Sequence, residues 1–237
     1  MTSDTALTMI VVAAGSGQRF GGPIPKQYLE LAGRPILFHT LKAFHEHAAI
    51  TNILPVIAAE SHDLWNRMLG PWLEELPRVR TPIAGGATRQ ESVCRGLAAL
   101  QLDSEAWVGI HDAARPFPGK ALLDRLLEGR RKNDALCAAI PAADTVKRVD
   151  PKEGMIIETL ERSHIWLAQT PQLFRYGMIF SAHQRARAAH FHGTDDASLA
   201  EWAGIHVRII PGDIGNIKIT HPDDLQLARK WLREDGL

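Results

Sequence analysis

The sequence predicts an α/β fold with a mostly parallel, twisted sheet that is covered by helices on both faces. Apolar runs of strand length alternate with segments of helical period along the chain, an order typical of parallel sheets with crossover helices. The runs also lack in-and-out alternation, as expected of strands buried on both faces. The length of 237 residues suits one large α/β domain. We therefore expect a single Rossmann-like domain over residues 1–237.

Strands and helices are expected to alternate along most of the chain. The predicted strands are residues 8–14, 52–58, 78–84, 106–111 and 135–141, then 206–211 and 216–220. Apolar residues recur at helical spacing in residues 36–47, 61–76, 89–101, 120–132, 176–189 and 197–203. Thr88 followed by Glu91 predicts a capping box at the start of the third helix. A last helix begins after Pro222, with two acidic residues favourably placed in its first turn.

One stretch interrupts the alternation. Residues 144–149 and 155–160 are predicted to form two short strands around a turn that contains Pro151 and Gly154. A two-stranded hairpin is marginal in water by itself, so it either folds back on its own domain or reaches a second copy of the chain. Because both strands carry charges typical of exposed surface, we favour a β-hairpin arm over about residues 141–164 that supports a homodimer.

Composition excludes several classes of protein. The 27 Lys and Arg residues balance 27 Asp and Glu, so the chain lacks the basic surplus that strong nucleic-acid binding requires. Its apolar runs are shorter than the roughly 20 residues that span a bilayer. A signal peptide has basic residues before its apolar stretch, and here no basic residue precedes the first apolar stretch. Cys94 and Cys137 are too few for a disulfide framework. We expect a cytoplasmic protein without nucleic-acid or membrane partners.

A glycine-rich segment follows the first predicted strand, where open α/β sheets bind ligands. Its sequence is Ala13-Ala14-Gly15-Ser16-Gly17-Gln18-Arg19, continuing through Phe20 to Pro25 and Lys26. Such a turn lets backbone N–H groups approach an anion. Neither common phosphate loop fits, because Phe20 replaces the third glycine of the dinucleotide fingerprint and Pro23 replaces the lysine of the P-loop.

Arg19 and Lys26 are the cations of this segment. No acidic residue occurs between Asp4 and Glu30, so neither cation has a carboxylate partner nearby in the sequence. Backbone amides together with two cations suit a polyphosphate better than a single pyrophosphate. The alternative is an ordinary solvated surface loop.

Two further segments are expected at the same edge of the sheet. Asp112 ends the fourth predicted strand and is a candidate ligand for Mg²⁺, which binds through one or two carboxylates plus substrate phosphates. The alternative is a turn aspartate that pairs with Arg115. The glycines of Gly85-Gly86 and the hydroxyl of Ser92 could recognise the edge of a base, although an ordinary turn and helix cap would have the same sequence.

A set of motifs occurs along the chain in a recognisable order and spacing: Ala13-Ala-Gly-x-Gly-x-Arg19, Pro25-Lys-Gln27, Gly85-Gly86 with Arg89 and Ser92-Val93, His111-Asp-Ala-Ala-Arg-Pro116, Asp144-Thr145, Thr170-Pro-Gln172, Thr194-Asp-Asp-Ala-Ser198 and Asn216-Ile-Lys-Ile-Thr220. The set resembles the 2-C-methyl-D-erythritol 4-phosphate cytidylyltransferase family from about Met9 to the C-terminal helix. It is specific as a set, whereas single motifs occur in other sugar nucleotidyltransferases.

The resemblance implies transfer of CMP from CTP to 2-C-methyl-D-erythritol 4-phosphate, with release of pyrophosphate, in the non-mevalonate route to isoprenoids. It implies Mg²⁺ as the cofactor, with Asp112 at the metal and the ribose, and Arg19 and Lys26 as the catalytic pair. The implied CTP-binding residues are Ala13, Ala14, Gly15, Ser16, Gly17, Gly86, Ala87, Ser92, Asp112 and Ala113. The implied residues for the sugar-alcohol phosphate are Thr145, Arg162, Thr170, Thr194 and Lys218, with Thr145 and Arg162 reaching the partner subunit's substrate.

Three departures from the family pattern are visible: Val12 where proline is frequent, Gln18 where a basic residue is frequent and Ala87 where an acid is frequent. Gln18 removes one charge from the phosphate segment and could weaken triphosphate binding. Other readings stay open from the sequence. They are a sister cytidylyltransferase for ribitol 5-phosphate, a non-catalytic nucleotide-binding module, and a nicotinamide-dependent dehydrogenase, which the missing fingerprint glycine disfavours.

Overall fold

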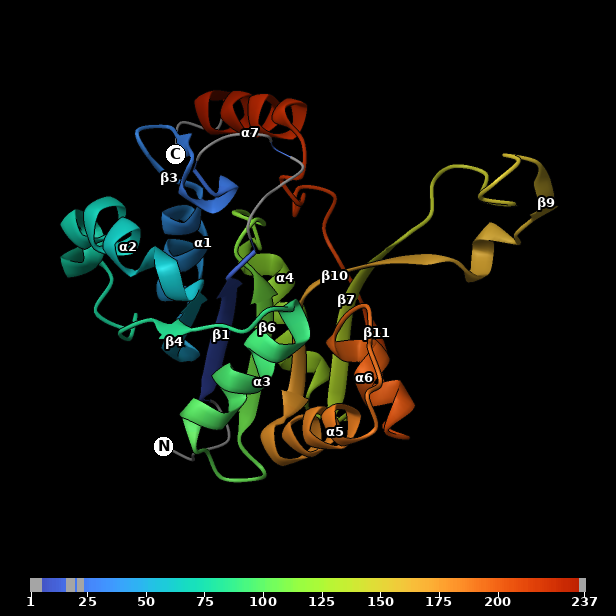
Figure 1. Ribbon diagram of the computed structural model, residues 1–237, viewed down its shortest axis with the longest axis horizontal. Helices are drawn as coiled ribbons and strands as arrows, with labels where there is room; N and C mark the ends of the chain where they lie inside the picture. Colours follow the sequence, from blue (N-terminus) through green and yellow to red (C-terminus); the bar gives the residue numbers. More distant parts are fainter. Residues whose placement is uncertain (1–5, 16–19, 21–23, 235–237) are drawn as a thin grey trace.

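The structure, a computed structural model, describes residues 6–15, 20 and 24–234. Within them, a seven-stranded sheet has the order β11-β7-β10-β6-β1-β4-β5 (Figure 1). The strands are β1 (Leu7–Ala13), β4 (Ile50–Ile57), β5 (Ile83–Ala84), β6 (Trp107–Asp112), β7 (Ala135–Pro141), β10 (Trp166–Arg175) and β11 (Arg208–Pro211). Neighbouring strands are parallel except around β10, which is antiparallel to both β6 and β7. The predicted α/β class and mostly parallel sheet are confirmed.

Both faces of the sheet are buried, as the continuous apolar runs predict. Along β1, Met9 and Val11 pack into one core cluster, and Ile10 between them packs into the other. The first cluster includes side chains of α1 (Ile36–His45), α2 (His62–Met68) and α4 (Lys120–Gly129). The second includes side chains of α3 (Arg89–Leu100), α5 (Tyr176–Ala188) and α6 (Asp196–Trp202). Among the described residues, no helix combines the length and hydropathy that crossing a membrane requires.

A third, smaller core lies beside the main one. The C-terminal helix α7 (Pro222–Glu234) packs Leu225 and Ala228 against Leu31 and Ile219. Leu31 belongs to a tiny hairpin of β2 (Glu30–Leu31) and β3 (Arg34–Pro35), which the sequence did not predict. This core holds the segment before α7 against the rest of the domain.

Two strand predictions were wrong in part or in full, and one strand was missed. Residues 78–84 form only the short β5 and an isolated bridge from Val79 to Ile53. Residues 216–220 are irregular, because the Ile219 N–H donates to the Ala114 carbonyl in the loop after β6 rather than to a strand. In contrast, β10 was not predicted, because it carries buried polar residues and Pro171 where an apolar run would mark a central strand.

The predicted hairpin is present and projects from the sheet (Figure 1). Its strands β8 (Lys147–Val149) and β9 (Ile156–Thr159) pair with each other, and every residue in both is exposed. The hairpin therefore does not fold back on its own domain. It extends from the ends of β7 and β10, and it displays apolar side chains, among them Met155, Ile156 and Ile157 at 64%, 61% and 55% exposure.

Candidate functional site

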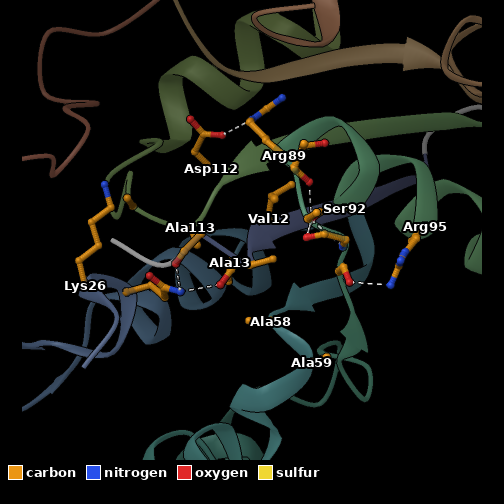
Figure 2. Close-up of a pocket in the computed structure, with 18 of the residues that line it drawn as sticks. Val12, Ala13, Lys26, Ala58, Ala59, Arg89, Ser92, Arg95, Asp112 and Ala113 are labelled. Carbon is orange, nitrogen blue, oxygen red and sulfur yellow. Dashed lines mark hydrogen bonds and ion pairs between the residues drawn. The ribbon is translucent and has the colours of Figure 1, made fainter. Parts of the chain in front are cut away.

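A cavity of about 770 Å³ opens at the carboxyl ends of the parallel strands β1, β4 and β6 (Figure 2). This is the edge at which open α/β sheets bind ligands. These strands contribute their last residues or the residues that follow, the loop after β5 and the start of the next helix contribute more of the lining, and two lysines come from elsewhere in the chain. The cavity is lined by Val12, Ala13, Ala14, Gly15, Lys26, Gln27, Ala58, Ala59, Glu60, Gly85, Gly86, Ala87, Thr88, Arg89, Ser92, Arg95, Asp112, Ala113, Ala114, Lys218 and Thr220.

The turn after β1 is held from below by Gln27. Its side-chain amide donates to the carbonyls of Ala13 and Gly15 at 2.5 and 3.1 Å, and the residue is only 3% exposed. A Cβ placed on Gly15 would meet no protein atom within 4 Å, so packing inside the chain does not explain this glycine. A glycine at this edge leaves the backbone open to a close-fitting ligand.

Lys26 lines the cavity at the left of the view in Figure 2, and its Nζ donates to the Ile219 carbonyl at 2.8 Å. Because Ile219 belongs to the small core under α7, this contact fixes the ammonium group relative to the C-terminal segment. The other predicted cation, Arg19, lies outside the described residues, as do Ser16 and Gly17. The role of Arg19 and Lys26 as a catalytic pair therefore stays a prediction.

The loop after β5 is locked by side chains of α3. Ser92 Oγ accepts the Gly86 N–H at 3.0 Å and donates to the Thr88 carbonyl at 2.8 Å. Glu91 accepts the Ala87 N–H at 2.9 Å, so both amides of the predicted base-binding loop are satisfied inside the protein. Thr88 caps α3, because its hydroxyl accepts the Glu91 N–H at 3.1 Å, but the predicted capping box is only half formed, since the Glu91 carboxylate accepts the Ala87 N–H and not that of Thr88.

Both glycines of this loop are required by close packing. A Cβ on Gly85 would lie 2.7 Å from Ala14 Cβ, and one on Gly86 would overlap the Glu91 side chain. Arg95 also holds this loop in place, because it donates to the Gly85 carbonyl and to Glu91, each at 2.7 Å. The loop is therefore prearranged before any ligand arrives.

Asp112 lies at the end of β6 between two cations. Arg89 Nε donates to its Oδ1 at 2.9 Å, and Lys218 Nζ donates to its Oδ2 at 2.6 Å. Burial alone would raise the pKa of Asp112, but the positive charges of Arg89 and then Lys218 outweigh burial and hold that pKa well below its usual range. The carboxylate is thus ionised at neutral pH and available as a hard oxygen ligand.

Beneath Asp112, a neutral histidine holds the backbone. Burial lowers the pKa of His111 to about 4, so its ring is uncharged at pH 7. His111 Nε2 lies 2.9 Å from the Arg115 carbonyl and must carry the proton, which leaves Nδ1 to accept from the Thr170 hydroxyl at 3.0 Å. The same hydroxyl accepts the Asp112 N–H at 3.1 Å. Thr170 therefore supports Asp112 from β10 and does not line the cavity.

The structure gathers part of the predicted site. Ala13, Ala14, Gly15, Lys26, Gly86, Ala87, Ser92, Asp112, Ala113 and Lys218 all line the cavity. Thr194 is exposed in the loop before α6 and lies outside the lining. Thr145 and Arg162 are on the projecting hairpin, where Arg162 Nη1 donates to the Ala143 carbonyl at 2.9 Å and braces its base. The predicted alternative pairing of Asp112 with Arg115 does not occur, because Arg115 donates instead to the Asn216 carbonyl at 2.7 Å.

The roles of Arg89 and Asp196 were not predicted from the sequence, although both residues lie within the family motifs. Arg89 bridges Asp112 to Asp196, whose Oδ2 lies 2.8 Å from Arg89 Nη1. Asp196 is fully buried. A usable signal was the capping box before Arg89, since it predicts that this side chain starts a helix at the ligand edge.

The chain resembles proteins of one family along almost its whole length. The model of the family described as 2-C-methyl-D-erythritol 4-phosphate cytidylyltransferase matches residues 7–234. A protein of that name from Geobacter metallireducens is 43% identical over 97% of this chain and 98% of its own length. One from Bacillus licheniformis is 41% identical over 96% of each chain.

Solved structures agree with these relatives. The crystal structure of the 2-C-methyl-D-erythritol 4-phosphate cytidylyltransferase from Francisella tularensis is 34% identical, covers 95% of this chain and 99% of its own, and superposes with a TM-score of 0.81. The 4-diphosphocytidyl-2C-methyl-D-erythritol synthase of Anaerococcus prevotii is 29% identical, covers 97% of each chain and also has a TM-score of 0.81.

Proposed function

Because the chain belongs to the 2-C-methyl-D-erythritol 4-phosphate cytidylyltransferase family, it is a CTP-dependent nucleotidyltransferase of isoprenoid biosynthesis, and we propose that its cavity is the active site. The reaction joins CMP from CTP to 2-C-methyl-D-erythritol 4-phosphate, giving 4-diphosphocytidyl-2-C-methyl-D-erythritol and pyrophosphate. One observation carries the placement: Lys26, Asp112 and Lys218, far apart in the sequence, line one cavity beside a glycine turn.

CTP is placed with its phosphates on the turn after β1 and its base on the loop after β5. The triphosphate would meet the amides from Ala13 to Gly17, and the cytosine would lie along Gly86, Ala87 and Ser92. In support, the second loop is already rigid, and a prearranged loop loses little entropy when it binds a base. Asp112 and Ala113 would reach the ribose.

The chemistry requires no general base. The acceptor is a phosphate monoester with a second pKa near 6, so it is already mostly dianionic at pH 7. One of its oxygens attacks the α-phosphorus of CTP in line with the departing pyrophosphate. His111 could not serve as a base in any case, because it is buried and both ring nitrogens are engaged. The difficulty is bringing two anions together, which positioned cations such as Arg19 and Lys26 solve.

A divalent ion fits the donor chemistry at Asp112. Each carboxylate oxygen has two lone-pair directions, so the contacts of Arg89 and Lys218 leave acceptor capacity facing the cavity. Among the described residues no cluster of three acidic, histidine or cysteine side chains forms a metal cage. A single carboxylate with substrate phosphates is the usual Mg²⁺ arrangement, so Asp112 would hold Mg²⁺. When bound, the ion supplies positive charge to the phosphates as pyrophosphate leaves.

The acceptor site is proposed to combine two subunits. Lys218 offers an ammonium at the cavity and Thr194 lies in the loop before α6, while Thr170 supports Asp112 from below. Thr145 and Arg162 would come from the partner's hairpin. The apolar side chains exposed on the hairpin support a homodimer, because they lack cover in one subunit. Two free cysteines, Cys94 and Cys137, are consistent with a proposed cytoplasmic location.

The deciding experiment measures pyrophosphate release by the purified protein with CTP, Mg²⁺ and 2-C-methyl-D-erythritol 4-phosphate. Ribitol 5-phosphate serves as the contrasting acceptor, and D112N as the matched variant, since it removes only the charge of the cavity carboxylate. We expect Mg²⁺-dependent turnover with the methylerythritol phosphate and severe loss in D112N. Turnover with ribitol phosphate alone, or CTP binding without any turnover, would contradict the proposal.

A further inference from the structure

A series of side-chain contacts leads from α5 to the cavity through His183, Asp196, Arg89 and Asp112. His183 Nε2 lies 3.1 Å from Asp196 Oδ1, Asp196 Oδ2 lies 2.8 Å from Arg89 Nη1, and Arg89 Nε donates to Asp112 Oδ1 at 2.9 Å. His183 and Asp196 are 1% and 0% exposed, so neither touches a ligand in the cavity. We propose that His183 and Asp196 are positioning residues, which hold the Arg89 guanidinium so that it orients Asp112.

Asp196, which lies behind Arg89 in this series of contacts, is held firmly by its surroundings. Asp196 opens α6, whose cap Asp195 forms a capping box with Ser198. Gln172 of β10 donates to Asp195 Oδ2 at 2.7 Å and accepts the Ala197 N–H at 2.9 Å. The start of α6 is therefore tied to the central sheet, and the Asp196 carboxylate has a fixed place from which to hold Arg89.

Charge balance explains why Arg89 needs this anchor. Asp112 faces two cations, Arg89 and Lys218, and Asp196 supplies the second negative charge. With Asp196 neutral, both cations would compete for Asp112 alone. The guanidinium would also lose the second of its two anchoring carboxylates and could rotate about its bond to Asp112.

His183 has one described polar partner, which makes its contribution separable. An ionised carboxylate only accepts, so His183 Nε2 must donate to Asp196, whereas Nδ1 is buried without a hydrogen-bond partner among the described residues. Glutamine carries an amide N–H at a similar reach to Nε2, and leucine carries none. H183Q should therefore preserve the function that H183L removes.

The test compares H183L, H183Q and D196N with H62A, which removes an exposed histidine at the start of α2. For each protein, kcat and KM are measured separately for CTP and for the methylerythritol phosphate. We expect H183L and D196N to lower kcat/KM for CTP by about 10–100-fold, the range seen when partners of metal ligands are removed. H183Q and H62A should stay close to wild type, and H183L/D196N should be no worse than D196N.

Unchanged kinetics in H183L, or equal loss in H183L and H183Q, would overturn the inference. Should H183L fail to fold, H183N against H183Q makes the same comparison, because only glutamine reaches the Nε2 position. The inference rests on the proposed function, and its failure is distinguishable. If wild type turns over and D112N does not, silent His183 variants refute only the positioning role. If wild type itself lacks turnover, the proposed function fails.

Discussion

Asp112 and Lys218 stand 106 positions apart in the chain, yet their side chains meet at 2.6 Å in the cavity. The contact closes the C-terminal segment over the end of β6. Because Asp112 is the proposed metal ligand and Lys218 a proposed acceptor ligand, the two sites share one ion pair. Substrate binding must therefore redistribute these contacts rather than fill two independent pockets.

Removing the charge of Lys218 should weaken binding of the acceptor more than binding of CTP. In K218M the Asp112 carboxylate keeps Arg89, whereas the cavity loses a cation that faces an anionic acceptor. We expect KM for the methylerythritol phosphate to rise by about 10–100-fold, the loss of one charge-assisted hydrogen bond. Steady-state kinetics with each substrate varied in turn measure this. A rise confined to CTP would contradict the assignment of Lys218.

Removal of Lys26 should impair the chemical step. K26A deletes an ammonium that lines the cavity beside the phosphate turn. By analogy with single oxyanion-stabilising donors, kcat should fall by about 10²–10³-fold, and R19A should have a similar effect. K132A, which changes an exposed lysine after α4, is the matched control. Near wild-type kcat in K26A would remove Lys26 from the catalytic pair.

A methyl group on Gly86 should disturb the base-binding loop. The added Cβ would overlap Glu91, which must move and release the Ala87 amide. We expect kcat/KM for CTP to fall by up to about 100-fold, since small misplacements near reacting groups have effects of that size. G70A adds a methyl group that meets no atom within 4 Å and should leave the kinetics unchanged. An active G86A would show that the loop adapts.

The hairpin should serve the acceptor of the other subunit. R162A removes a guanidinium at the base of the hairpin, so KM for the methylerythritol phosphate should rise by about 10–100-fold while KM for CTP changes little. Light scattering at the assay concentration should still report a dimer. In a mixed dimer of R162A and K26A subunits, one active site regains both groups, and activity should exceed that of either parent. No recovery would place Arg162 in its own subunit's site.

Acid should weaken the fold through Asp196. Burial would raise its pKa, but Arg89 and the hydrogen bond from His183 lower it below the usual range, so the folded protein binds fewer protons there than the unfolded chain. Its contribution to the free energy of unfolding is therefore present above about pH 4 and is lost as the pH falls below that.

Urea unfolding between pH 7 and pH 3 measures this effect. Stability of D196N should depend less on pH over the acid part of that range than stability of wild type. D63N, which changes an exposed aspartate on α2, should follow wild type. Identical pH dependence in wild type and D196N would show that Asp196 is not held ionised in the fold.

Local patterns were sufficient for much of this fold. The run through Met9, Ile10 and Val11 predicts a strand buried on both faces, because each side chain meets a different helical layer. The failures come from long-range compensation. Gln172 makes β10 look unlike a central strand, and its burial is tolerated because distant partners such as Asp195 and Ala197 satisfy its side-chain amide.

The candidate site likewise has one part that local patterns predict and another that depends on long-range packing. Sheet-edge reasoning placed Asp112 and the glycine turns correctly, since the carboxyl ends of parallel strands converge. The link from Arg89 to Asp196 could not be predicted, because the two residues come from separate helices whose packing no local pattern encodes.

The route of β10 through the sheet has a mechanical consequence. The chain leaves the sheet along β7, turns through the hairpin and re-enters along β10, which reaches Thr170 shortly after Trp166. Thr170 carries the hydroxyl on which the Asp112 amide rests. The strand that begins at the base of the hairpin thus also supports the carboxylate, so a covalent path of only a few residues joins the hairpin to the base of the cavity.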